Sequence, residues 1–168
     1  MSFPLRPAES LTLQKCVTYF NESNKWKELS GIINLEDEDV ALSRIESFVM
    51  QYAPANDTKY LLKTKGGSRT FVVADEYKTE IRQYTKRLME PFKRDKNRLI
   101  RINAGDNLTI TTTIGQLNYM RWAFQGGVIK YMRMHPEISL RRKGGEGTSS
   151  RSDTQPTLAE ASSSASTA

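Results

Sequence analysis

Residues 111–135, TTTIGQLNYMRWAFQGGVIKYMRMH, decide the fold of this chain. On a helical wheel, apolar side chains cover most of the circumference of residues 114–125. The exceptions form one narrow polar ridge: Asn118, Arg121 and Gln125. A helix that is apolar on nearly all sides is buried inside a protein. The stretch therefore predicts a central core helix, with Thr113 as its N-cap.

The same stretch also has the outline of a helix-turn-helix, with Gly126-Gly127 as the hinge and a short second helix before Pro136. A DNA-reading helix needs several exposed side chains that reach base edges. Here the apolar residues of the second helix are expected to face inward, which leaves only Lys130 and Arg133 outside. We therefore favour a core helix that ends at the glycine pair and is followed by an exit turn.

Two hairpin patterns lie upstream of this helix. Strand-like residues flank Gly66-Gly67, and again flank residues 104–106. The first hairpin is followed by a helical pattern that starts at the candidate N-cap Asp75 and stops before Pro91. The order ββα-ββα predicts an α+β domain over residues 57–143, in which a four-stranded antiparallel sheet has helices on one face.

The first 56 residues predict an acidic helical segment. In residues 34–53 the apolar positions fall on one helical face: Leu42, Ile45, Phe48, Val49 and Tyr52. Asn34 is the expected N-cap, and the acids at residues 36–39 would then lie in the first turn, where the helix dipole favours negative charge. This explains the acidic run without a bound calcium ion.

The end of the chain and the single cysteine give expectations about disorder and about the cellular compartment. Residues 144–168 contain 11 Ser or Thr among 25 residues and show no apolar periodicity, which predicts a disordered tail. Cys16 lies among apolar neighbours, so we expect a small core residue in a reducing compartment. No apolar run is long enough for a membrane span, and no secretory signal is visible. The expected location is intracellular, nuclear or cytoplasmic.

Charge is distributed unevenly along the chain. The total is +6, but residues 58–143 carry 19 basic and 7 acidic residues, a net charge of +12. A positive field of this kind attracts polyanions. The cations of this section that we expect to contact phosphates are Lys63, Lys65, Arg69, Lys78, Arg82, Lys86, Lys93, Arg94, Lys96, Arg98 and Arg101. Lys78, Arg82 and Lys86 are spaced four residues apart and form a stripe if the helix continues through them.

Enzyme chemistry has little support in the sequence. His135 and Cys16 are the only residues of their kinds, which are too few for a typical zinc site, and no nucleophile motif is present. We therefore expect no catalytic residues, no metal and no cofactor. The predicted function is non-enzymatic binding of nucleic acid, either DNA or RNA. The nucleic acid would be single-stranded if the ring of Tyr60 or Phe71 stacks on bases; the alternative for each ring is packing in the core. The alternative is a structural or assembly protein, in which the acidic N-terminal helices of one copy contact the basic domain of another.

Overall fold

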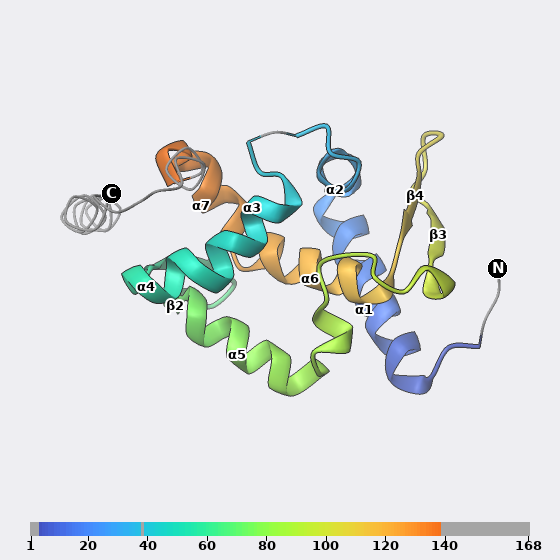
Figure 1. Ribbon diagram of the computed structural model, residues 1–168, viewed down its shortest axis with the longest axis horizontal. Coiled ribbons are helices and arrows are strands. Elements are labelled where there is room, and N and C mark those ends of the chain that lie inside the picture. Colours follow the sequence, from blue (N-terminus) through green and yellow to red (C-terminus); the bar gives the residue numbers. More distant parts are fainter. Residues whose placement is uncertain (1–3, 38, 139–168) are drawn as a thin grey trace.

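The computed structural model describes residues 4–37 and 39–138, which form an α+β fold (Figure 1). The α-helices of this part are α1 (Pro7–Ser23), α2 (Trp26–Ile33), α3 (Leu42–Ser47), α4 (Ala53–Asn56), α5 (Val73–Tyr84), α6 (Ile114–Gln125) and α7 (Val128–Met134). The strands are β1 (Lys59–Thr64), β2 (Gly67–Val72), β3 (Ile100–Asn103) and β4 (Thr109–Thr112). A π-helical turn, η1 (Phe48–Tyr52), joins α3 to α4, and two 3₁₀ turns, η2 (Arg87–Met89) and η3 (Lys96–Arg98), follow α5. The predicted α+β class is confirmed; the predicted tail, 144–168, lies outside the described residues.

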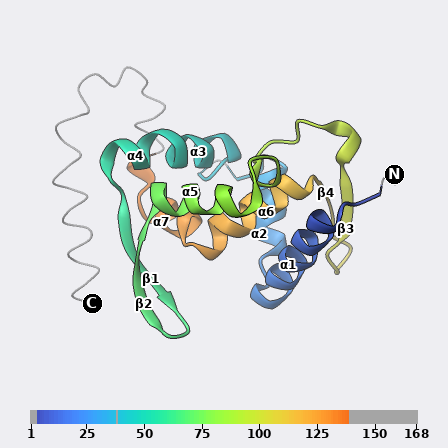
Figure 2. The ribbon, with the colours of Figure 1, turned by 90° about the horizontal axis from the view of Figure 1, so that it is seen from below.

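Helix α6 is the centre of the fold. It spans the residues that the sequence predicts, and ten of its twelve residues are buried. Its N-cap is Thr113, whose hydroxyl accepts a hydrogen bond from the backbone N–H of Gln116 at 3.1 Å. Figures 1 and 2 show α6 running through the middle of the molecule, with the other helices arranged around it. The prediction of a buried core helix is confirmed.

One hydrophobic core joins the N-terminal helices to the basic half of the chain. Cys16 and Phe20 of α1 are fully buried in the same cluster as Leu117 and Trp122 of α6. The ring of Phe20 also meets the ring of Phe124 edge-on, with 5.8 Å between centroids. The predicted boundary near residue 56 therefore marks a change in charge and in sequence pattern. The hydrophobic core is continuous across this boundary.

The chain leaves α6 through Gly127, which has a φ of 76° and begins the short helix α7. A Cβ on this glycine would sit 3.2 Å from a methyl carbon of Leu62, so both the backbone conformation and the space favour glycine. Val128, Ile129 and Met132 are buried, as the sequence predicts. Because the apolar face of α7 is buried, the structure favours the interpretation of α7 as an exit turn after the core helix over that of a DNA-reading helix.

The two hairpins form separate sheets, so the prediction of one four-stranded sheet was wrong. β1 pairs with β2, and β3 pairs with β4, each pair antiparallel. Figures 1 and 2 place the β1–β2 hairpin at one end of the molecule and the β3–β4 hairpin at the other. Each hairpin docks where its own apolar side chains meet the helices: the Tyr60 hydroxyl, for example, donates to the Gly126 carbonyl at 2.8 Å. Alternating patterns specify which side of a strand is buried, but not which strand lies beside it.

The described acids Glu36, Asp37 and Asp39 lie between α2 and α3 and not in the first turn of a helix. Asn34 is the C-cap of α2, and α3 begins only at Leu42, so the predicted N-cap was wrong. The apolar face of the following helical stretch is confirmed, because Leu42, Ile45, Phe48 and Val49 are buried. Before α3, the carboxylate of Asp37 accepts a hydrogen bond from the backbone N–H of Val40 at 3.2 Å.

Candidate nucleic-acid interface

Helix α5 carries two of the predicted phosphate contacts on its outer face. Lys78 and Arg82 are both exposed, four residues apart. Tyr77, on the inner face, packs its ring against the rings of Tyr119 and Trp122 of α6 at 6.2 and 5.5 Å. The apolar inner face therefore leaves the basic outer face to solvent.

The basic stripe is shorter than predicted, because α5 ends at Tyr84. Thr85 has a φ of 73°, which breaks the helix, and Lys86 lies beyond it. The chain turns here because the next segment is tied to α6: the side-chain amide of Asn118 donates to the Leu88 carbonyl at 2.8 Å. Lys86 remains exposed, but it does not continue the stripe of Lys78 and Arg82. The candidate N-cap Asp75 was also misplaced, since α5 begins two residues earlier, at Val73.

Residues 86–98 form a second group of cations, held in place by buried amides of α6. The side chain of Gln116 donates to the Pro91 carbonyl at 2.9 Å, next to the contact of Asn118 with Leu88. Gly115 lies so close to this segment that a Cβ would sit 2.5 Å from the Arg87 carbonyl oxygen. The segment holds six basic and two acidic residues, a net charge of +4. Its backbone is therefore fixed to the core while its charges face outward.

A pocket of about 260 Å³ opens between this segment, the start of α1 and the start of α6. Its lining includes three arginines, Arg87, Arg94 and Arg98, the acids Glu90 and Asp95, and the ring of Phe92. The buried carboxylate of Glu9 also lines the pocket and bonds to Arg98 at 2.5 Å and to Arg87 at 3.0 Å. Burial raises the pKa of Glu9, but hydrogen bonds from the backbone N–H of Arg6 and from the two arginines outweigh it and bring the pKa to about 2.

The first hairpin places its cations at the far end of the molecule. Lys63 and Lys65 are exposed, at the end of β1 and in the turn. Arg69 of β2 forms a two-pronged ion pair with Glu76 of α5, at 2.6 and 3.3 Å. The cations of the first hairpin are therefore not beside those of residues 86–98, because α5 lies between them (Figure 2).

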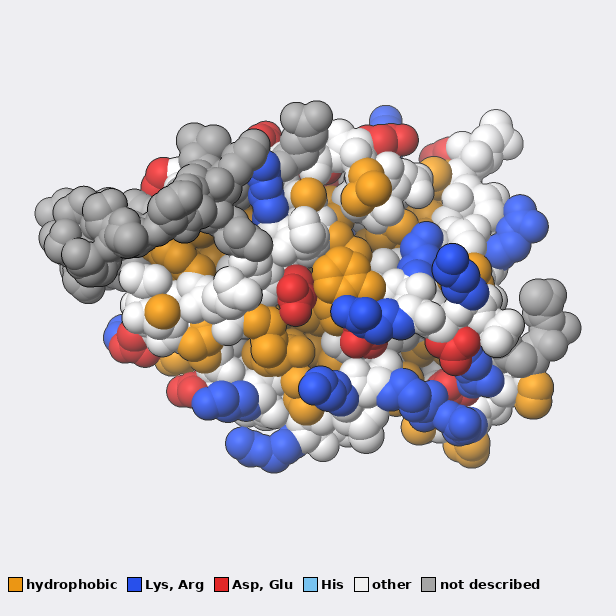
Figure 3. Space-filling view, viewed as in Figure 1, with side chains coloured by type: hydrophobic (Ala, Val, Ile, Leu, Met, Phe, Trp, Pro, Cys, Tyr) orange, Lys and Arg blue, Asp and Glu red, His pale blue; other side chains and the backbone are white. Residues whose placement is uncertain are grey.

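The eleven predicted contacts divide into two kinds. Arg69, Arg94 and Arg98 pair with Glu76, Glu90 and Glu9. The other eight have no ion pair with any described residue: Lys63, Lys65, Lys78, Arg82, Lys86, Lys93, Lys96 and Arg101. Figure 3 shows Lys and Arg side chains following the edge formed by α5 and continuing over the neighbouring segment toward the start of α1. This edge is the candidate interface.

The two candidate stacking rings belong to the core. Phe71 is only 2% exposed. The ring of Tyr60 is stacked between Phe71 and Tyr131, with centroid distances of 5.4 and 4.9 Å. The hypothesis that either ring is open to a base was wrong, and core packing was the correct alternative.

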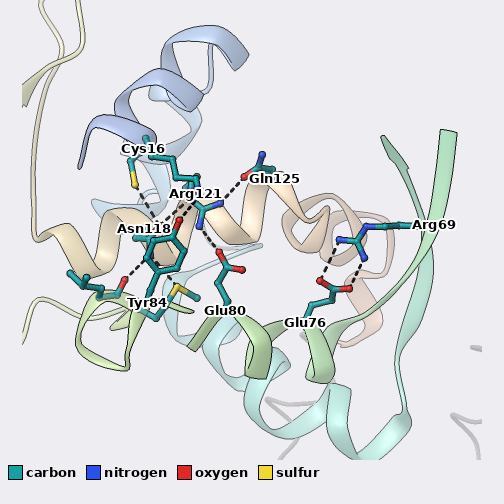
Figure 4. Close-up of polar contacts among 11 residues, drawn as sticks. Cys16, Arg69, Glu76, Glu80, Tyr84, Asn118, Arg121 and Gln125 are labelled. Atoms are coloured by element: carbon teal, nitrogen blue, oxygen red, sulfur yellow. Dashed lines mark hydrogen bonds and ion pairs between the residues drawn. The ribbon is translucent and has the colours of Figure 1, made fainter. Parts of the chain in front are cut away.

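The sequence reasoning missed a buried ionic network on α6 (Figure 4). Arg121, placed on a polar ridge by the helical wheel, is 4% exposed. Its guanidinium donates to Glu80 of α5 at 2.7 Å, to Gln125 at 2.6 Å and to Asn118 at 3.0 Å. The guanidinium also lies over the ring of Tyr84, 5.6 Å from its centroid. The sequence held one signal of this network, an isolated arginine in an otherwise apolar helix. A buried charge needs a partner, so such an arginine indicates an acidic side chain nearby in the fold.

The cysteine and the acidic side chains were the remaining candidates for a chemical site. Cys16 is buried, and burial raises the pKa of its thiol to about 11, which keeps it protonated at neutral pH. Within residues 4–37 and 39–138, no group of three His, Cys, Asp or Glu side chains could hold a metal ion. None of the helices in the same ranges is long and apolar enough to cross a membrane.

Fold and surface together define an α+β protein with a buried central helix and a basic edge. The family of unknown function DUF7197 matches residues 4–167, and the chain belongs to this family. The chain is also similar to the uncharacterized protein L507 of Acanthamoeba polyphaga mimivirus, with 30% identity over 136 residues. That match covers 79% of this chain and 52% of L507, so the chain spans about half the length of this relative. No solved structure matches the chain.

Proposed function

We propose that the protein binds nucleic acid without catalysing a reaction on it, through contacts of its basic edge with phosphates. The observation that carries the proposal is the group of predicted cations on α5 and residues 86–98 that have no ion pair among the described residues: Lys78, Arg82, Lys86, Lys93 and Lys96. Cations left unpaired on a folded surface are available to replace the counterions of a phosphate backbone. Contacts of this kind position a nucleic acid without reading its sequence.

The alternative is charged self-assembly through the acidic N-terminal helices. Several of those acids already pair within the chain: Glu9 with Arg87 and Arg98, and Glu28 and Asp37 with Arg133. Fewer acidic side chains are then left for a second copy, which favours the nucleic-acid proposal. Size-exclusion chromatography after nuclease treatment, read at 260 and 280 nm, distinguishes a nucleic-acid complex from a protein oligomer.

The direct test reverses the charges of the basic edge. We expect the triple variant Lys78→Glu, Arg82→Glu, Lys86→Glu to lose most of its affinity for labelled single-stranded DNA and RNA, measured by fluorescence anisotropy. Neutral replacements at the same positions should weaken binding similarly for unrelated sequences. The slope of log affinity against log salt should fall by about 0.7–0.9 for each phosphate that the variant no longer neutralises.

A matched control carries the same charge change elsewhere. Lys27→Glu, Arg44→Glu, Lys130→Glu changes residues on α2, α3 and α7, outside α5 and residues 86–98. Either triple variant changes the net charge by −6, from +6 to zero. A location-specific interface requires the first variant to lose much more affinity than the second. Equal losses, or no measurable affinity of the unchanged protein, refute the proposal.

A further inference from the structure

We propose that the pocket between α1, α6 and residues 86–98 binds a terminal phosphate, the phosphomonoester of a nucleic-acid end or of a free nucleotide. This inference rests on the proposed function, because it names the part of the nucleic acid that one section of the basic surface recognises. The observations that carry it are the pocket's arginines, the carboxylate that already lies on two of them, and the size of the pocket.

Guanidinium groups suit phosphate because their planar forks of N–H donors match its oxygens. Arg94 uses only its Nε, in a bond to Glu90 at 2.8 Å, and its guanidinium lies 5.3 Å from the centroid of Phe92. Arg87 uses only its Nη1, in the bond to Glu9. Since each guanidinium has five N–H donors, both side chains keep donors that no described residue accepts.

The internal anion shows that this corner already holds an oxyanion. Glu9 is only 3% exposed, yet its carboxylate is kept ionised by Arg98 and Arg87. The charged lining of the pocket itself is balanced, with three arginines against Glu9, Glu90 and Asp95; Lys86, Lys93 and Lys96 of the same segment raise the net charge of residues 86–98 with Glu9 to +3. A phosphomonoester carries about −1.5 to −2 charges at neutral pH, and the three neighbouring lysines are the charges that would offset it.

Size and shape favour a terminal phosphate over a phosphate within a strand. A volume of about 260 Å³ lies just below the usual range for small-molecule pockets, roughly 300–1,000 Å³. It can take a phosphate and part of a nucleoside, but not a duplex. The lining also includes the apolar side chains of Leu88, Phe92 and Ile114, which suit the sugar or base. The start of α6 adds N–H groups that have no partner inside the helix.

The experiment compares two oligonucleotides of the same sequence, one with a 5′-phosphate and one with a 5′-hydroxyl. We expect the unchanged protein to bind the phosphorylated strand about tenfold more tightly. This is the gain in affinity expected from one additional charge-assisted hydrogen bond. Arg94→Gln should reduce this preference to near unity, whereas Arg44→Gln, on α3 and outside the pocket, should retain it. The side chain of Arg94 is 70% exposed, and circular dichroism and a thermal melt check that the variant folds.

The possible outcomes separate the two proposals. Equal affinity of the unchanged protein for both strands overturns the phosphate pocket and leaves the general nucleic-acid proposal intact. Binding of neither strand refutes that general proposal, and calorimetry with AMP then tests the pocket alone. AMP binding that Arg94→Gln removes supports a free nucleotide as the ligand, and absence of AMP binding overturns the inference.

Discussion

The buried pair of Arg121 and Glu80 allows a quantitative test of how α5 is held on α6. We consider a double-mutant cycle of Arg121→Met and Glu80→Gln, which removes each charge while keeping much of each volume. The side chain of Arg121 is 5% exposed and that of Glu80 is 17% exposed, with 2.7 Å between the guanidinium and the carboxylate. Both residues belong to the network in Figure 4.

Removing one partner of a buried ion pair typically destabilises a protein by about 3–5 kcal/mol, because the remaining charge is left without compensation. Glu80 retains some access to water, so we expect Arg121→Met to lower the free energy of unfolding by about 3 kcal/mol, at the low end of that range. Glu80→Gln leaves the more buried guanidinium with two amide partners, and we expect a loss of about 2 kcal/mol. The double variant should be more stable than the sum of these losses predicts, by about 1–2 kcal/mol.

Urea denaturation followed by circular dichroism measures each free energy of unfolding. The matched control is the cycle of Arg69→Met and Glu76→Gln, which joins the same residue types between β2 and α5 on the surface. The side chain of Arg69 is 50% exposed, so each control change should cost under about 1 kcal/mol. Additive effects at Arg121 and Glu80, or losses as small as those of the control, would show that the buried pair contributes no coupling.

Three further predictions concern buried residues. Trp122→Ala should destabilise the fold by roughly 3–5 kcal/mol, measured by the same denaturation, because it removes a large ring from the core; a loss under about 1 kcal/mol would contradict a buried α6. The pKa of Glu9 is lowered from 4.5 to about 2, so its stabilisation is complete above about pH 4.5 and is lost as the pH falls toward 2. Thermal melts should show that Glu9→Gln removes part of this acid sensitivity, up to about 3 kcal/mol, whereas an unchanged pH profile would argue against the pairing with the arginines. Cys16 should resist alkylation by iodoacetamide at pH 8 until urea unfolds the chain; rapid labelling of the native protein would show that the thiol is accessible.

Local patterns predicted the elements that depend on local chemistry. The limits of α6 follow from a side-chain cap at Thr113 and from a glycine pair that ends the helix. Both hairpins follow from strand-like residues around turns that contain glycine. These signals lie within a few residues of the structure that they specify, so one sequence is enough to find them.

The errors arose where distant residues decide the outcome. The end of α5 depends on Asn118, which holds Leu88 from a position 30 residues away. The burial of Arg121 depends on Glu80, 41 residues away in the chain. The pocket at Arg98 depends on Glu9, 89 residues away. The periodicity of a single helix carries no information about such distant partners. The sequence therefore shows which residues are basic, but not which of them lie together on the folded surface.

The separation of the two hairpins affects how the protein behaves at high concentration. In the described part of the chain, β1 and β2 pair only with each other, so their outer edges keep backbone groups that another strand can pair with. Charged side chains on edge strands oppose such pairing between molecules, and Lys63, Lys65 and Arg69 lie on this hairpin and its turn. We therefore expect Lys63 and Lys65, two predicted phosphate contacts without an ion pair among the described residues, to oppose aggregation as well. Neutral substitutions on this hairpin would remove both properties together, whereas substitution by glutamate would retain a charge at the edge and keep the protein dispersed.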